Sequence, residues 1–137
     1  PWSAALDTPE NRRFLQRIRA ATKKDAIGTA AAINYGAAMW IVEAIKTVNG
    51  NVEDKDKFFR TLRATEIRSS PRGPIKIDKY GHIIQNVYFR RVDKVGNTYQ
   101  NTVIDTYPSV SQFWKYNPEE FLKQPVYDRN FPPCKYC

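Results

Sequence analysis

Apolar positions in the first half of the chain recur at helical spacing. Thr8, Pro9 and Glu10 offer a cap, a first-turn proline and an early acid, and the stripe that follows predicts a helix over 8–22. The next predicted helix covers 26–49, and its wide apolar arc indicates burial on more than one side. Acidic residues precede basic ones over 53–64, which predicts a third helix.

The pattern changes near Arg68 from helical spacing to alternation. Strands are predicted over 74–78, 84–92 and 98–107, and the short turns between them indicate an antiparallel meander. A short helix is predicted from Asn117 to about Lys123, and the tail after it, rich in proline and aromatic residues, is expected to lie extended over the surface. The pattern therefore predicts helices followed by a strand meander.

Composition narrows the class of protein only modestly. A chain of 137 residues can form one domain with its own core. No stretch approaches the roughly 18–20 consecutive apolar residues that a membrane span needs. The net charge of +8 makes a basic nucleic-acid-binding domain one alternative. The basic residues are mixed with acidic ones, however, and those over 12–24 alternate with apolar residues, which is typical of a solvated helix face.

Residues that could carry chemistry are few. The single histidine, His82, lies beside a turn glycine, and no nucleotide-binding or nucleophile motif occurs, so we expect no enzymatic activity, no cofactor and no metal. Cys134 and Cys137 form a C-x-x-C pattern, for which redox, zinc and disulfide roles are conceivable. No helix follows Cys134 and no further cysteine is present, which favours a local disulfide or two inert thiols.

Three stretches resemble a known family when taken in order. They are Tyr35–Ala38 within the alanine-rich helix, 58–65 followed by 70–82, and 85–92. Together they resemble the closing third of type I periplasmic solute-binding proteins of the leucine/isoleucine/valine-binding class. The resemblance covers about residues 1–115 and leaves a tail over 116–137 unexplained. It implies an α/β chain that forms the C-terminal segment of a two-lobe fold.

The resemblance also implies a function. It indicates an extracytoplasmic, periplasmic receptor of an ABC importer that binds amino acids, aromatic acids or related small carboxylates by hinge closure, without covalent chemistry. The expected partners are the solute, the permease subunits in the membrane, the missing N-terminal part of the polypeptide and a second copy of the chain, but no nucleic acid. A signal peptide is expected upstream of Pro1, where the chain has neither an initiating Met nor a signal sequence.

Trp2 and Tyr35 are the candidate ligand-binding residues, because aromatic side chains near the hinge of such a fold can line the solute cleft. The alternative is that both pack in the core or between lobes. A free-standing α+β interaction module remains the other alternative for the whole chain.

Overall fold

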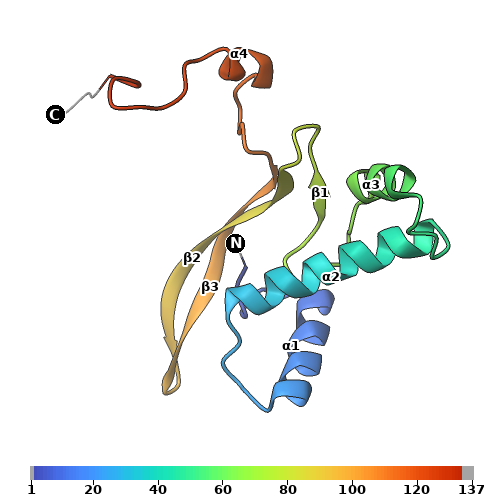
Figure 1. The fold of residues 1–137 in the computed structure, drawn as a ribbon. Helices are drawn as coiled ribbons and strands as arrows, with labels where there is room; N and C mark the ends of the chain where they lie inside the picture. The colour runs from blue at the N-terminus through green and yellow to red at the C-terminus, as the bar shows by residue number, and fades with distance from the viewer. Residues whose placement is uncertain (1, 134–137) are drawn as a thin grey trace.

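The computed structural model describes residues 2–133. Three helices come first, then three strands and a short final helix (Figure 1): α1 Pro9–Thr22, α2 Thr29–Thr47, α3 Lys55–Ala64, β1 Ile75–Ile77, β2 Ile83–Val95, β3 Thr98–Val110 and α4 Pro118–Leu122. All the predicted helices and strands are confirmed in type and order. β2 runs further than expected because its pairing continues to the tight turn at Gly96 and Asn97, and β3 because Val110 at its far end still pairs with Gln85 of β2.

The sheet is antiparallel in the order β1-β2-β3. The β2–β3 hairpin is long, and Figure 1 shows it extending well beyond the short β1. Phe89 pairs with Asp105 and Arg90 with Val103, so Ile104 is an extra residue in β3 at this point. Such a bulge bends the ladder and raises its twist.

Helix α2 is the central element of the helical half. Toward its N-terminus Ala32 packs in a core with Phe14 and Leu15 of α1. Further along the helix Trp40 packs with Ile67 and Ile75, and its indole Nε1 donates a 2.9 Å hydrogen bond to the carbonyl oxygen of Leu62 at the end of α3. The expectation that this helix is buried on more than one side is wrong, because its buried residues follow one another at intervals of four and form a single stripe: Ala32, Gly36, Trp40 and Ala44.

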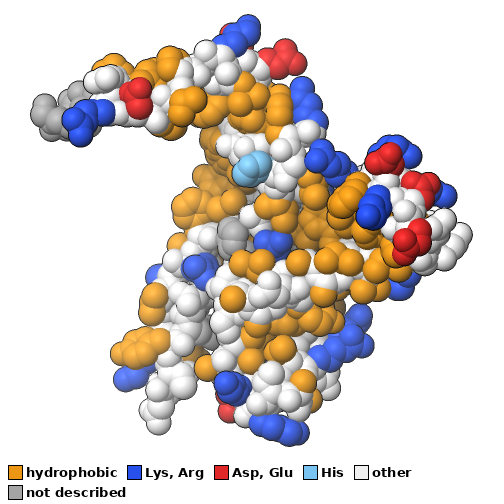
Figure 2. All heavy atoms as spheres, viewed as in Figure 1, with side chains coloured by type: hydrophobic (Ala, Val, Ile, Leu, Met, Phe, Trp, Pro, Cys, Tyr) orange, Lys and Arg blue, Asp and Glu red, His pale blue; other side chains and the backbone are white. Residues whose placement is uncertain are grey.

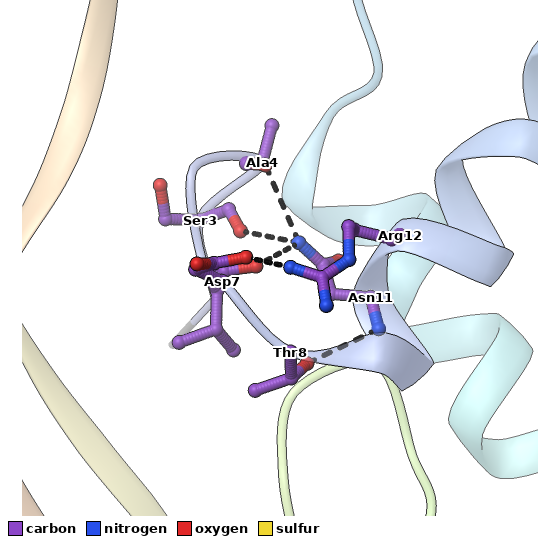
Figure 3. A network of polar contacts seen from close by, with 7 residues as sticks. Ser3, Ala4, Asp7, Thr8, Asn11 and Arg12 are labelled. Atoms are coloured by element: carbon purple, nitrogen blue, oxygen red, sulfur yellow. Dashed lines mark hydrogen bonds and ion pairs between the residues drawn. The ribbon is translucent and has the colours of Figure 1, made fainter.

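The side chain of Asn11 fastens the N-terminal segment to α1 (Figure 3). It is fully buried, and its Oδ1 accepts a 2.8 Å hydrogen bond from the indole Nε1 of Trp2. Its Nδ2 faces the carbonyl oxygens of Ser3 and Ala4 at 3.3 Å each and of Leu6 at 2.8 Å. The amide thus supplies a donor to the Ala4 carbonyl and adds one to the carbonyls of Ser3 and Leu6, which also accept from backbone N–H groups two or three residues on.

Helix α4 is attached to the β1–β2 turn. The Gln112 amide donates a 2.8 Å hydrogen bond to Asp78 Oδ2, and the ring of Phe113 lies between those of Tyr80 and Phe121, with centroids 5.1 and 5.6 Å away. Asn117 caps the helix.

The expectation that the tail lies over the surface is wrong. Val126 is 86% exposed and Tyr127 66%, and Figure 1 shows the segment after α4 projecting from the body. Because α4 sits at one end of the sheet, the chain leaves from that end with no core surface beside it. Cys134 and Cys137, and with them the expected disulfide, lie outside the described residues.

Replacing Asn11 tests its role in the fold. We expect Asn11→Ala to lower the free energy of unfolding by about 3 kcal/mol, because it leaves the buried indole N–H of Trp2 and the carbonyl oxygen of Ala4 without partners and opens a cavity in the core. Urea denaturation measures this loss. Asn34→Ala, on the exposed face of α2, is the control and should cost little. A loss for Asn11→Ala no larger than that of the control would contradict the role.

The Asp78 contact gives a pH prediction. Burial by itself raises the pKa of Asp78, but hydrogen bonds from the Gln112 amide and from the backbone N–H groups of His82 and Tyr80 outweigh it and lower the pKa. The ionised form therefore favours the folded state at pH values above the unfolded pKa, and this contribution is lost as the pH falls through the lower folded pKa. Carboxyl NMR titration should show Gln112→Ala raising the pKa of Asp78, whereas Gln100→Ala should leave it unchanged.

Candidate functional site

A hollow of about 810 Å³ lies between the N-terminal segment, the α1–α2 connection and the hairpin. Figure 1 shows these three segments converging near the N-terminus. The residues that line the hollow are 2–5, Arg19, 25–29, Arg90 and 98–101. Segments far apart in the sequence thus meet at one concave surface, which is the usual setting of a ligand site.

Two contacts hold the N-terminal segment against the hairpin at the edge of the hollow. Arg90 Nη1 donates a 2.7 Å hydrogen bond to the carbonyl oxygen of Trp2. The hydroxyl of Ser3 donates to the carbonyl oxygen of Asn101 on β3. Asn11 fixes the other side of the same segment, so the wall formed by residues 2–5 is anchored to both the helical half and the sheet.

The N-terminus of α2 opens into the hollow. Its N-cap is Gly28, which has extended backbone dihedrals and no side chain to cap the helix, and the first turn contains no acidic residue. The first backbone N–H groups of a helix have no intrahelical acceptors, and the helix dipole makes this end partly positive. Uncapped N–H groups at the edge of a hollow favour a carboxylate.

The charged residues around the hollow add to this preference. Two guanidinium groups line it, those of Arg19 and Arg90, against one carboxylate, that of Asp25. Arg19 Nε also donates a 3.4 Å hydrogen bond to the carbonyl oxygen of Asp25, which steadies the α1–α2 connection. The hollow is therefore suited to an anionic ligand.

Of the two predicted ligand residues, Trp2 lies at the hollow and Tyr35 does not. Trp2 lines the hollow but is only 2% exposed, and its ring packs edge-on against Phe14 at 5.9 Å. Tyr35 is outside the lining: its ring lies 5.0 Å from that of Phe14, and its hydroxyl accepts a 3.4 Å hydrogen bond from Arg17. These contacts give both residues packing roles, and ligand contact by either stays a prediction.

Sequence reasoning missed Gly28 and Arg90. The signal for Gly28 was available, since a long helix that begins with no Ser, Thr, Asp or Asn at its cap leaves its N–H groups free. Arg90 could not be found this way, because only the folded hairpin brings it to residues 2–5.

Other kinds of site find no support in residues 2–133. No group of three His, Cys, Asp or Glu side chains in that range could hold a metal ion. None of the helices there has the length and apolar character to cross a membrane.

Comparison with known proteins decides the family. Residues 1–97 match the sequence model of a family described as periplasmic binding protein. The chain belongs to this family. The family consists of binding proteins rather than enzymes, and membership favours the receptor interpretation over the two alternatives drawn from sequence.

Individual relatives agree with this assignment. The chain is 32% identical over 108 residues to a Leu/Ile/Val-binding protein homolog 6 of Brucella abortus, covering 77% of this chain and 27% of that protein. It is similar to an ABC transporter substrate-binding protein from Sphaerobacter thermophilus (26% identity, TM-score 0.76, 80% of this chain and 30% of that one). A solute-binding protein of an ABC transporter from Rhodopseudomonas palustris, in complex with 3,4-dihydroxybenzoic acid, gives 29% identity and a TM-score of 0.73 over 80% of this chain and 30% of that one.

The fold and the family resemblance expected from the sequence are thereby confirmed. The chain spans about 27–30% of the length of the relatives it matches.

Proposed function

We propose that this chain is part of an extracytoplasmic receptor of an ABC importer, and that it supplies one wall of the solute site. The observation that carries the proposal is the uncapped N-terminus of α2 at the hollow beside Arg19 and Arg90. A volume of about 810 Å³ is ample for a small solute. Because this hollow is open along one side of a short chain, a second wall is needed to enclose a ligand.

The solute class we propose is a small carboxylate, either an amino acid or an aromatic acid. Support comes from the names of two relatives, one a Leu/Ile/Val-binding homologue and the other a complex with 3,4-dihydroxybenzoic acid. These two ligand types differ in their side groups but share the carboxylate. That is the group to which the free N–H groups of Thr29 and Ala30 can donate hydrogen bonds.

The remaining expectations belong to the same proposal. Residues 1–115 form the C-terminal part of the solute-binding domain, and 116–137 form a tail with its own short helix. The receptor acts in the periplasm after export by a signal peptide, and the closed form docks on the permease subunits. The α2 terminus and the hairpin lie on different segments, so a solute that contacts both stabilises one relative position of the two. A ligand can favour closure only by binding the closed form more tightly than the open one.

Substitution of Gly28 tests the solute site. We expect Gly28→Asp to cap α2 with its own carboxylate, which stabilises the helix and blocks a bound carboxylate by occupation and charge repulsion. NMR should show the amide resonances of Thr29–Ala31 shifting on addition of leucine or 3,4-dihydroxybenzoate to the natural chain, weakly because one wall is present. Gly28→Ala, which adds a methyl group in open space, should retain the response.

The Gly28→Asp chain should show none of these shifts. Equal shifts in the Asp and Ala variants, or no response to either acid in the natural chain, would argue against this site.

Self-association or a companion segment is expected because apolar surface remains uncovered. Figure 2 shows hydrophobic side chains gathered along α2, where Ile33 is 38% exposed and Ile41 and Val42 are each 48% exposed. On the β2–β3 hairpin, the exposed rings of Phe89 and Tyr107 lie 5.2 Å apart. Contiguous exposed apolar patches usually mark interfaces.

Light scattering tests the α2 surface. We expect the natural chain to be larger than a monomer and Ile41→Lys to shift it toward the monomer with little change in stability, since Ile41 is half exposed. Thr47→Lys, at an exposed position of the same helix, adds the same single positive charge, serves as the matched control and should not dissociate the chain. A strictly monomeric natural chain would contradict the expectation of self-association.

A further inference from the structure

The ring of Tyr99, on β3, lies at the hollow and is free of contact with other aromatic rings. It is 73% exposed, more than any other aromatic side chain among residues 2–133. Each of the other exposed aromatic residues in that range lies beside a second ring. Tyr99 therefore presents an unused aromatic surface to a molecule that occupies the hollow.

The register of the hairpin points Tyr99 toward the helical half. Side chains four residues apart on a strand share one face of the sheet. Arg90 of β2 reaches the Trp2 carbonyl from this face, so Lys94 lies on it too. Lys94 pairs with Tyr99, and residues directly opposite each other in a ladder share a face. Tyr99 and Arg90 thus belong to the same wall of the hollow.

The other wall is the α1–α2 connection, which ends at the free N–H groups of α2. Figure 1 shows this connection and the turn of the hairpin at the same end of the molecule. Ile27, directly before the Gly28 cap, lines the hollow and packs partly on the core around Phe14. A ligand whose carboxylate binds at the first turn of α2 therefore has an apolar side chain beside it and the free ring of Tyr99 on the hairpin side.

The charges of the lining favour an acid that has no amino group. The charged side chains of the lining are Arg19, Arg90 and Asp25, so two positive charges face one negative charge and one positive charge is left over. The partly positive end of α2 adds to this excess. A monocarboxylic acid neutralises the excess, whereas an amino acid brings an ammonium together with its carboxylate and leaves it in place.

We infer that the hollow takes an aromatic carboxylic acid in preference to an aliphatic amino acid, and that Tyr99 is the residue that determines this specificity. The carboxylate binds the free N–H groups of α2, and the ligand ring packs offset or edge-on against the ring of Tyr99. Leucine offers no ring to Tyr99 and adds a positive charge. The inference rests on the solute site proposed above and narrows its solute class.

NMR titration of the 137-residue chain with matched acids measures this preference. Benzoate and cyclohexanecarboxylate are similar in size and are both ionised at neutral pH, so the aromatic ring is the main difference between them. We expect benzoate to bind about threefold to tenfold more tightly, which is the range that one aromatic pair contributes. Intermolecular NOEs should connect the ring protons of benzoate and Tyr99. Equal affinities, or the absence of these NOEs, would overturn the role of Tyr99.

Two tyrosine variants give a matched comparison. Tyr99→Leu removes the ring but keeps an apolar side chain at an exposed position, so the chain should fold. In this variant benzoate should bind no more tightly than cyclohexanecarboxylate. Tyr127→Leu makes the same replacement in the tail, outside the lining of the hollow, and should keep the preference. A preference that survives in Tyr99→Leu would exclude Tyr99 as its origin.

Leucine and 4-methylpentanoate isolate the effect of charge, because the second acid is leucine without its amino group. We expect 4-methylpentanoate to bind more tightly than leucine and less tightly than benzoate. Leucine binding as tight as that of benzoate would overturn this inference while leaving the solute site at α2 intact. Failure of all four acids to shift the amide resonances of residues 29–31 would instead remove the solute site itself, and this inference with it.

Discussion

The buried amide of Asn11 is the contact on which the arrangement of the chain depends. It bonds the indole of Trp2 and faces three backbone carbonyls of residues 3–6, which lets an irregular segment lie in the interior. A segment fixed in this way can present Trp2 and Ser3 to the hairpin, where Arg90 and Asn101 meet their polar groups. Without the amide, the indole N–H of Trp2 and the carbonyl oxygen of Ala4 would lose their partner, and the segment would no longer be tied to α1 by a hydrogen-bonding side chain.

Helix α2 links the two halves of the structure because it is narrow. Alanine at position 32 and glycine at position 36 are both buried, which brings α1 and the α3–β1 connection close to its backbone. The same helix begins at an uncapped glycine beside the hollow. One helix therefore has uncapped N–H groups at its start and a close contact with the α3–β1 connection at Gly36. Both features follow from the small side chains of its first turns.

The basic residues of this chain fall into two groups, one exposed to solvent and one held by hydrogen bonds. Most of the positive charge lies on exposed residues, where ion pairs contribute little to stability. Arg72 and the guanidinium groups at the hollow differ, because they are held by hydrogen bonds to neutral partners such as Gln85 and backbone carbonyls. Membership in the periplasmic binding protein family fits this arrangement better than it fits a protein that binds a nucleic acid through a broad basic surface.

Local pattern determined the type and order of every helix and strand, because caps, apolar spacing and turn residues act over a few positions. Pattern also gave the family through stretches such as Tyr35–Ala38 and 70–82. It could not place the hollow, since Arg90 and Thr98–Asn101 reach residues 2–5 only through the twist and register of the hairpin. Nor could it show that Trp2 is held by Asn11, or that the tail leaves the body. Those outcomes depend on contacts between segments distant in sequence, which only the tertiary structure decided, because packing and hydrogen bonding at long range are set by the whole chain.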